Sequence, residues 1–376
     1  MNKGDKMVEK ILENYDIEGN LIGIETNNSG NINKTYIVKF LNNEKEEKYL
    51  VQKINNSVFS EPYKLMKNIE GVTNFLKVQL QKEQDMEHKT LEIVKTKEDS
   101  LLCVIEDDKH EKEYYRVYKF IEDAIAYDFS TDKIVVFNTG KAFGNFQRLL
   151  ANYPMNKLTE TIKDFHNTPI RFKKLMEDIK IDPKNRVTEV AKEIVFILKR
   201  EDICSLIMNG LNTKEIPLRV THNDTKVNNV MMRKDNGEFL AVIDLDTVMP
   251  GSLLFDYGDG IRSTASNAKE DETNLEKVSI NLDLFEAYTD GYMSEMAPCL
   301  TREELNLMAE SIRIITLELA IRFLNDYING DTYFKVDYKE HNLDRARNQI
   351  KLVEDIENKL NYMKEYIMKS YNKYKG

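Results

Sequence analysis

The residues best suited to chemistry lie in two stretches of the second half of the chain. The first, THNDTKVNNVMM, contains Asp224, Lys226 and Asn229, and the second, AVIDLD, contains Asp244. A carboxylate can orient and deprotonate an alcohol, a nearby lysine can screen a transferring phosphoryl group, and an amide can ligate Mg²⁺. The spacing therefore predicts phosphoryl transfer, with Asp224 and Lys226 as catalytic residues and Asn229 and Asp244 as metal ligands. We interpret the lone His222 as a structural residue that braces the loop.

The sequence between these stretches explains how they would come together. NNVMM and FLAVID are apolar enough to form short buried strands, and Asp235, Asn236 and Gly237 between them suit a tight turn. A hairpin would bring Asp244 close to the first stretch, and we expect Asp246 to hold water, metal or substrate on a second acidic loop. The alternative, two loops of solvated acidic residues, leaves the joint occurrence of both motifs unexplained.

Composition limits the class of protein. With 376 residues the chain is too long for one small core, so we expect two lobes. A formal net charge of −10 provides no basic surface for nucleic acid, and three widely separated cysteines fit a reducing compartment. No apolar run approaches the roughly 20 residues that span a bilayer. We expect a cytoplasmic protein that acts as a monomer and has no nucleic-acid or membrane partner.

The first third of the chain has the pattern of a small antiparallel sheet. LIGIETNNSGNINKTYIVKF indicates two strands joined by a tight polar loop, and KYLVQKIN indicates a third. In the loop, Ser29, Gly30 and Asn31 could turn backbone N–H groups toward phosphate oxygens, although a plain hairpin turn explains the same residues. Lys53 ends the third strand and could reach a nucleotide's phosphates, whereas the alternative is a solvated lysine.

A helix and a crossover segment complete this lobe. Apolar spacing predicts a helix from about Glu61 to Leu80, in which Glu61 and Glu70 are both candidates for an ion pair with Lys53. LEIVKT and SLLCVIE indicate two more strands.

The segment YYRVYKFIED is strand-like and aromatic up to Ile121 and acidic beyond it, as expected of a hinge. Its apolar side chains could sandwich a flat base, and backbone groups of Lys119, Phe120 and Ile121 could bond the base edge. A core strand without a ligand explains these residues equally well. We place a nucleotide-binding lobe at residues 1–121 and a catalytic, substrate-binding lobe at residues 122–376.

The second lobe is expected to be mainly helical. IVVFNTGKAFGNFQRLL has helical spacing, and residues 187–211 form a long amphipathic segment that Gly210 would close. IPLRVTHND indicates a short strand that leads into the first stretch. Three further helices are expected at roughly 274–296, 301–328 and 341–371.

With these motifs in place, the chain resembles the aminoglycoside phosphotransferase and choline kinase family, relatives of protein kinases. THNDTKVNN matches the family's catalytic loop H-x-D-x-x-x-x-N, and VIDLDTVMPG matches its IDxD-like metal motif. The resemblance covers nearly all of the chain. It implies an α+β, bilobal protein-kinase-like fold with ATP between the lobes and Mg²⁺ as cofactor. It also places Lys53 on the strand-three lysine, SGNINKTY on the phosphate loop and RVYKFI on the hinge.

A narrower resemblance is to bacterial N-acetylhexosamine 1-kinases. It is carried by GNINKTY, YLVQKINNSVF, HNDTKVNNVM, IDLDTVMPGSLLFDYGDGIR and IRFLNDYINGDTYFKVDYKEHNLDRARNQIKLV. It implies ATP-dependent phosphorylation of the C1 hydroxyl, with Asp224 touching the sugar and Arg322 and Tyr333 holding its hydroxyls or N-acetyl group. Residues near Arg262 and Ser263 would close the pocket. The family has GHIN where this chain has GNIN.

Asn31 therefore replaces a histidine that lies near the sugar in that family, which leaves the preferred sugar open while keeping Asn31 as a substrate-binding candidate. From spacing alone, Arg322 would instead pair with Asp326, and Tyr333 would pack within a loop. Three other functions remain open: a kinase for an aminoglycoside, choline or another small alcohol, a binding module on an inactive kinase fold, and a helical scaffold.

Overall fold

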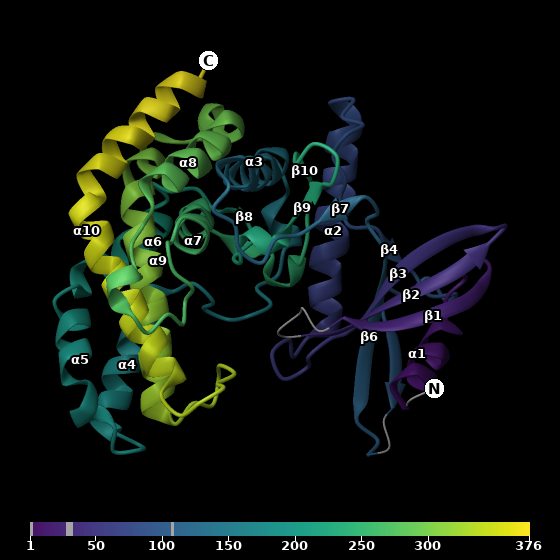
Figure 1. Cartoon of the computed structure of the whole chain (residues 1–376), viewed down its shortest axis with the longest axis horizontal. Coiled ribbons are helices and arrows are strands. Elements are labelled where there is room, and N and C mark those ends of the chain that lie inside the picture. Colours follow the sequence, from purple (N-terminus) through teal and green to yellow (C-terminus); the bar gives the residue numbers. More distant parts are fainter. Residues whose placement is uncertain (1–2, 28–32, 107–108) are drawn as a thin grey trace. The chain divides into compact units, whose positions relative to one another are not determined.

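Figure 1 shows the chain in a computed structural model that describes residues 3–27, 33–106 and 109–376. The chain divides into two compact units. Unit 1 consists of Met1–Ala124, Asn156–Lys163 and Ile243–Asp246, and unit 2 of Ile125–Met155, Asp164–Val242 and Thr247–Gly376. Unit 1 carries an antiparallel sheet and unit 2 is mainly helical, which confirms the predicted α+β class.

The core of unit 1 is a sheet in which β1, β2, β3, β6 and β4 follow one another and β5 also pairs with β6. All pairs are antiparallel. The strands are β1 (Asn20–Asn27), β2 (Lys34–Asn42), β3 (Lys45–Lys53), β4 (Ile93–Val94), β5 (Cys103–Glu106) and β6 (Lys112–Lys119). Asn43 and Glu44, with φ of 46° and 66°, form the turn between β2 and β3, because a two-residue hairpin needs left-handed angles at both positions. The strands predicted from the sequence are confirmed.

The side chains on the two faces of β6 contact two different helices. Successive side chains of a strand point to opposite faces. Tyr115 and Val117 join the apolar cluster of α1 (Lys3–Leu12), whereas Arg116 reaches Met66 of α2 (Pro62–Lys82) on the other face. The sheet therefore has a helix on each face (Figure 1), and one of these faces buries a charged residue.

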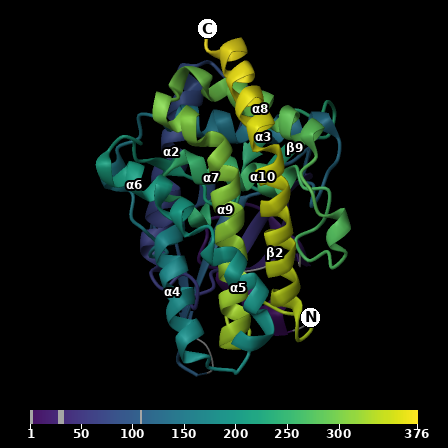
Figure 2. The same ribbon diagram turned by 90° about the vertical axis from the view of Figure 1, so that its left-hand side faces the viewer.

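Unit 2 is built from eight helices in the part of the chain that the structure describes. They are α3 (Lys133–Leu149), α4 (Thr168–Ile181), α5 (Ala191–Leu198), α6 (Leu206–Thr213), α7 (Leu253–Thr264), α8 (Leu282–Met296), α9 (Arg302–Asn329) and α10 (His341–Tyr374). Figure 2 shows α9 and α10 running side by side, with α4 beside α9. None of the helices within residues 3–27, 33–106 and 109–376 is both long and apolar enough to cross a lipid bilayer.

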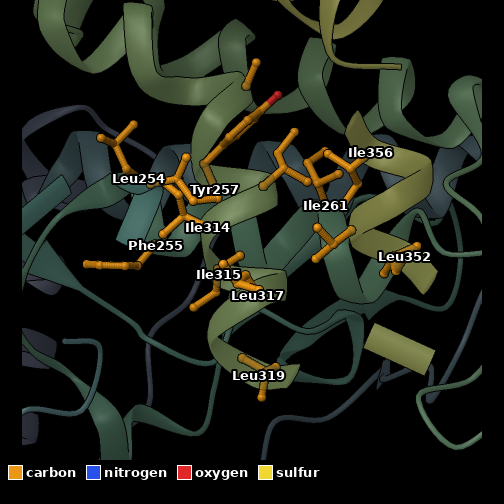
Figure 3. Packing of buried hydrophobic residues seen from close by; sticks show 14 of the residues in the cluster. Leu254, Phe255, Tyr257, Ile261, Ile314, Ile315, Leu317, Leu319, Leu352 and Ile356 are labelled. Atoms are coloured by element: carbon orange, nitrogen blue, oxygen red, sulfur yellow. The ribbon is translucent and has the colours of Figure 1, made fainter. Parts of the chain in front are cut away.

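The centre of unit 2 lies where α7 meets α9 and α10. Tyr257 and Ile261 of α7 are fully buried beside Ile314 and Ile315 of α9 and Ile356 of α10 (Figure 3). A helix that is apolar on most of its surface belongs in a core. This packing fixes α7, whose first turn carries a residue of the candidate site.

Two short sheets surround the predicted motifs. β9 (Val230–Arg233) and β10 (Phe239–Val242) form the expected hairpin, and Gly237 in its turn has φ +74°. β7 (Ala124–Ile125) joins the same sheet. β8 (Arg219–Thr221) pairs with β11 (Met249–Gly251) in a second sheet. The strand expected before the first motif is therefore confirmed.

One helical prediction was wrong. Residues 187–211 are not one segment: α5 ends at Leu198, α6 begins at Leu206, and Gly210 lies inside α6. A Cβ atom on Gly210 would lie 2.4 Å from the end of the Ile216 side chain, which would have to shift to accommodate it. No element was predicted at residues 253–264, where the structure has α7, and Ser252 caps this helix by accepting a hydrogen bond from Leu254 N.

The contact between α3 and α8 depends on glycine. A Cβ atom on Gly291 would lie 1.9 Å from the carbonyl oxygen of Phe137, and one on Gly140 would lie 2.1 Å from that of Tyr288. Both obstacles are backbone atoms, so neither can be removed by a rotamer change.

We predict that Gly291→Ala lowers the free energy of unfolding by about 3 kcal/mol, because a forced separation of packed helices is an overpacking defect. Gly23→Ala is the control, since the nearest atoms there lie 3.7 Å away. Urea unfolding of both variants checks this, and equal losses of stability in the two would contradict the assigned role of the close contact.

Candidate functional site

The loop 222–229, between β8 and the hairpin, is anchored by a buried carboxylate of α7. Asp256 accepts hydrogen bonds from the backbone N–H of His222 at 2.8 Å and of Asn223 at 2.7 Å. Gln147 of α3 donates a third bond, of 2.7 Å, to the same carboxylate. Burial raises the pKa of Asp256, although these bonds favour its charged form. The start of the loop is thus fixed to the helical core.

The next residues turn the chain sharply. Asn223 adopts φ +65°, and its side chain donates to the carbonyl oxygen of Thr247 at 2.8 Å. Thr247 returns a bond of 2.7 Å to the carbonyl oxygen of His222. The His222 ring lies edge-on to Phe143 and Phe146, and its Nδ1 accepts a bond of 3.3 Å from Asp224 N. The predicted bracing role of His222 is confirmed.

Asp224 follows this turn with its side chain 30% exposed. Lys226 Nζ lies 2.8 Å from Oδ1, and Asn229 Nδ2 donates to Oδ2 at 2.9 Å. Burial alone would raise the pKa of Asp224, but the positive charge of Lys226 and the bond from Asn229 lower it below its ordinary value. The attraction of Asp224 in turn raises the pKa of Lys226. Asp224 and Lys226 therefore form an ionised, partly exposed pair within unit 2, beside the buried amide of Asn229.

Oxygen atoms suited to a hard cation occur in each unit. Asn229 also bonds the Asp224 carbonyl oxygen through Nδ2, at 2.8 Å, so its amide oxygen is left to accept. Asp244, in unit 1, is exposed and has φ +57°. Such donors fit Mg²⁺, which takes few protein oxygens together with phosphates and water. Among residues 3–27, 33–106 and 109–376, no three His, Cys, Asp or Glu side chains gather as a metal site by themselves.

Asp246 differs from its expected role of holding water, metal or substrate. Arg116 NH1 and NH2 lie 2.5 and 2.9 Å from its two oxygens, and Asn33 Nδ2 donates to one of them at 2.5 Å. Arg116 is 2% exposed, and Gln52 accepts a further bond from its Nε at 3.0 Å. A buried guanidinium needs a paired carboxylate, so Asp246 serves as the counter-charge in unit 1.

Lys53 pairs with neither of its two expected partners. Its Nζ contacts Glu113 of β6, and Tyr115 Oη donates to the same carboxylate at 2.6 Å. Glu61 instead lies 2.6 Å from Lys64, and Glu70 lies 3.1 Å from Lys95. The antiparallel register of β3 and β6 makes the neighbouring strand, not the helix, the source of the counter-charge.

Of the remaining nucleotide-binding candidates, some lie outside the described residues and others already form backbone hydrogen bonds. Ser29, Gly30 and Asn31 lie outside the described residues. The N–H groups of Lys119 and Phe120 donate to Glu92 O at 2.9 Å and Lys48 O at 3.0 Å. A base edge would therefore have to be recognised by the other backbone groups of this segment, including those of Ile121.

Arg322 and Tyr333 line one cavity of about 220 Å³ in unit 2, which we call the Arg322 pocket. Its lining consists of Arg171, Lys174, Ile321, Arg322, Asn325, Asp326, Asn329, Thr332, Tyr333 and Phe334. The Arg322 guanidinium lies 5.9 Å from the Tyr333 ring centroid and 5.3 Å from that of Phe165. Tyr333 is 61% exposed, so its ring is accessible.

The alternative ion pair of Arg322 with Asp326 is not formed. Asp326 accepts backbone N–H groups of Thr332, Tyr333 and Phe334, each at 2.9 Å. It therefore shapes the chain after α9, which carries Tyr333.

Arg262 and Ser263, near which the sugar pocket was expected to close, lie elsewhere in unit 2. Arg262 is buried and pairs at 2.7 Å with both Asp259 and Glu270, and Ser263 Oγ donates to the carbonyl oxygen of Gly260 at 3.4 Å. Neither residue lines the Arg322 pocket.

His166 connects the Arg322 pocket to the loop 222–229. Its Nδ1 lies 2.7 Å from Glu318, and its Nε2 lies 3.3 Å from the carbonyl oxygen of Asn223. Phe165, the preceding residue, packs against Arg322. Burial would raise the pKa of Glu318, but His166 and neighbouring donors hold it below its ordinary value.

Sequence reasoning missed Arg116, His166 and Asp256 as residues that hold the site. His166 lies in the polar stretch DFHNT, which gives no signal of this role, whereas Arg116 and Asp256 are charged residues in apolar or aromatic runs, YYRVY and LLFDYG. A buried polar group needs a partner, so a charged residue inside such a run was the available signal.

We predict that Arg116→Met lowers the free energy of unfolding by about 3–5 kcal/mol, because it leaves the Asp246 carboxylate buried without its partner. Arg116→Met combined with Asp246→Leu should lose much less. Urea unfolding with exposed Arg302→Met as control checks this. A double variant no more stable than Arg116→Met would contradict the assigned pairing.

We also predict a pH-dependent effect of Glu318→Gln. The folded-state pKa of Glu318 is lowered, so the carboxylate stabilises the fold fully above its unfolded pKa of about 4.3 and loses this contribution as pH falls through the folded value. The stability difference between the variant and the wild type should therefore shrink as pH falls from 7 to 3. A difference that stays constant, or that grows on acidification, would contradict the lowered pKa.

The chain is similar to known proteins along most of its length. Residues 23–294 match the sequence profile of the Phosphotransferase enzyme family. A microcompartment-associated aminopropanol kinase superimposes with a TM-score of 0.61 at 14% identity, covering 96% of this chain and 98% of that chain. A spectinomycin phosphotransferase in complex with ADP and spectinomycin gives 0.56 at 11% identity, covering 95% and 98%.

A choline kinase from Cryptosporidium parvum Iowa II gives a TM-score of 0.53 at 14% identity, covering 96% of this chain and 97% of that chain. At these identities the three structures show the fold, and they confirm the predicted kinase-like architecture. The match to the family covers more than half of the chain and implies ATP as co-substrate. The chain therefore belongs to the Phosphotransferase enzyme family and is a small-molecule kinase.

Proposed function

We propose that the protein is an ATP- and Mg²⁺-dependent kinase that phosphorylates the anomeric C1 hydroxyl of an N-acetylhexosamine, either N-acetylglucosamine or N-acetylgalactosamine. The observation that carries the proposal is the Arg322 pocket: Arg322 and Tyr333, the two residues that the resemblance assigns to the sugar, line one cavity of unit 2. His166 links that cavity to the loop bearing Asp224. A sugar held there would lie in the same unit as the ionised carboxylate of Asp224.

Asp224 performs the central step of the proposed reaction. It orients the C1 hydroxyl and takes its proton as the sugar oxygen bonds to the γ-phosphorus of ATP and the bond to the leaving ADP oxygen breaks. Its low pKa makes it a weak base, so alignment and charge stabilisation contribute more than proton abstraction. Lys226, 2.8 Å from Asp224, screens negative charge on the transferring group.

The other candidates serve the nucleotide and the metal. Lys53 and the residues Ser29, Gly30 and Asn31 are assigned to the phosphates, and Asn31 also to the sugar. Lys119, Phe120 and Ile121 are assigned to the base. Asn229 and Asp244 would ligate Mg²⁺, which when bound neutralises charge on the phosphates.

The direct test of this function is ADP release with Mg·ATP and a panel of acceptors: N-acetylglucosamine, N-acetylgalactosamine, glucose, galactose, choline and kanamycin. We expect the highest kcat/KM with one of the two N-acetylhexosamines. Turnover of choline or kanamycin alone would leave the family assignment intact and overturn the sugar assignment.

We predict that Asp224→Asn lowers kcat on the order of a thousandfold, because it removes both the proton acceptor and one charge of the pair with Lys226. The KM for ATP should change little. Asp235→Asn, at an exposed turn position of the hairpin, is the matched control and should behave like the wild type. A near-normal kcat for Asp224→Asn would contradict the assignment of Asp224 as the catalytic base.

A further inference from the structure

The backbone of Asn223, the residue before Asp224, is held from two sides. Its N–H donates to Asp256 at 2.7 Å, and its carbonyl oxygen lies 3.3 Å from Nε2 of His166. Asn223 has φ +65°, a left-handed conformation that few non-glycine residues adopt. The carbonyl group belongs to the peptide that joins Asn223 to Asp224. The contact with His166 therefore fixes the peptide plane from which the Asp224 side chain projects.

His166 has supports of its own. Its Nδ1 lies 2.7 Å from Oε1 of Glu318, on α9, and Thr168 Oγ1 donates to Oε2 of the same carboxylate at 2.6 Å. The imidazole ring stacks on Phe255 of α7, with ring centroids 5.2 Å apart and an interplanar angle of 20°. The side chain of His166 is 6% exposed, and that of Glu318 is fully buried. Contacts from α7 and α9 therefore fix the ring.

The partners of His166 determine what its ring nitrogens do. A carboxylate and a carbonyl oxygen can only accept, so both contacts are hydrogen bonds when each ring nitrogen carries a proton. Burial would raise the pKa of Glu318, but the positive charge of His166, its hydrogen bond and the positive charge of Arg322 lower it. The buried carboxylate is therefore ionised at neutral pH and supplies a counter-charge for the ring. The ring can thus donate to Glu318 and to Asn223 at once.

We propose that His166, oriented by Glu318, is a positioning residue for phosphoryl transfer. It fixes the peptide between Asn223 and Asp224 and so keeps the Asp224 carboxylate directed at the acceptor hydroxyl. The proposal rests on the proposed function, which assigns Asp224 as the base. The lining of the Arg322 pocket does not include His166, so we expect His166 to act on the rate and not on the affinity for the acceptor.

The first experiment uses His166→Phe, which keeps an aromatic ring beside Phe255 and removes both hydrogen bonds. With Mg·ATP and the acceptor of highest kcat/KM in the panel above, kcat should fall on the order of a hundredfold, because a misplacement of about 1 Å is enough to cost that much. The KM values for ATP and for the acceptor should change by less than about threefold. His166→Gln, whose amide nitrogen can replace Nε2 as the donor, should regain about tenfold of the lost kcat. An unchanged kcat in His166→Phe, or a loss expressed only in KM, would overturn the proposal.

Hydrogen exchange reports on the loop without any acceptor. In His166→Phe the backbone amides of Asn223 and Asp224 should exchange about tenfold faster or more, whereas those of α9 should keep their wild-type rates. Unchanged exchange at the two loop amides would overturn the proposal whatever the acceptor, because the peptide would then be fixed without His166.

Two controls separate positioning from a general loss of stability. Thr168→Val removes the other hydrogen bond of the Glu318 carboxylate and leaves both His166 contacts in place. It should lower the urea midpoint of unfolding while kcat stays within about twofold of the wild type. His110→Phe makes the same substitution at a histidine whose side chain is 90% exposed, and it should match the wild type in both respects. A loss of kcat in Thr168→Val equal to that in His166→Phe would contradict the positioning role.

A double-mutant cycle tests whether Glu318 acts through His166. Glu318→Gln, which removes the counter-charge, should lower kcat by about tenfold in the wild type and have no further effect in His166→Phe. Full addition of the two losses would show that Glu318 affects the rate by another route, and it would overturn the role of Glu318 in orienting His166.

The outcomes also separate this proposal from the function on which it rests. A normal kcat in His166→Phe together with an impaired Asp224→Asn overturns only the role of His166. Phosphorylation of an acceptor other than an N-acetylhexosamine, with kcat reduced in both variants, overturns only the sugar assignment. A near-normal kcat in Asp224→Asn overturns the base assignment and, with it, the positioning role.

Discussion

A single buried carboxylate controls the geometry of the candidate site. Asp256 binds the N–H groups of two successive loop residues, His222 and Asn223, and so fixes the point from which Asp224 projects. It can do so because α7 is held by the core formed with α9 and α10 (Figure 3). A reacting group must be held within a fraction of an ångström, which requires supports that do not move. The apolar core of unit 2 therefore helps to fix the position of Asp224.

The two acidic residues of IDLD show how neighbours in sequence acquire different functions. Asp246 is buried against Arg116 and Asn33, whereas Asp244, two residues earlier, is exposed. The buried residue fixes the segment within unit 1, and the exposed one is accessible to solvent. The same division recurs in unit 2, where His166 and Glu318 support the loop 222–229 and Asp224 faces outward.

Local patterns predicted the strands of unit 1, the hairpin and the long helices, because hydrophobic periodicity and turn residues can be recognised from neighbouring positions in the sequence. These patterns failed where contacts between residues far apart in the sequence determine the structure. The sequence did not predict α7, in which Asp256 is buried by bonds to residues far away in the chain, His222, Asn223 and Gln147. Lys53 paired with Glu113 because strand register, which a helix-based expectation ignored, places β6 beside β3. Arg322 and Tyr333 were found only by resemblance.

The central claim is that Asp224 directs the γ-phosphoryl group of ATP to the C1 hydroxyl of an N-acetylhexosamine. Phosphorus NMR of the product formed from Mg·ATP and N-acetylglucosamine or N-acetylgalactosamine tests this most directly, because coupling of phosphorus to the anomeric proton identifies the phosphorylated carbon. We predict a sugar 1-phosphate, formed by the wild type and not by Asp224→Asn at matched times. A phosphate on any other carbon, or the same product from the variant at an equal rate, would contradict the account.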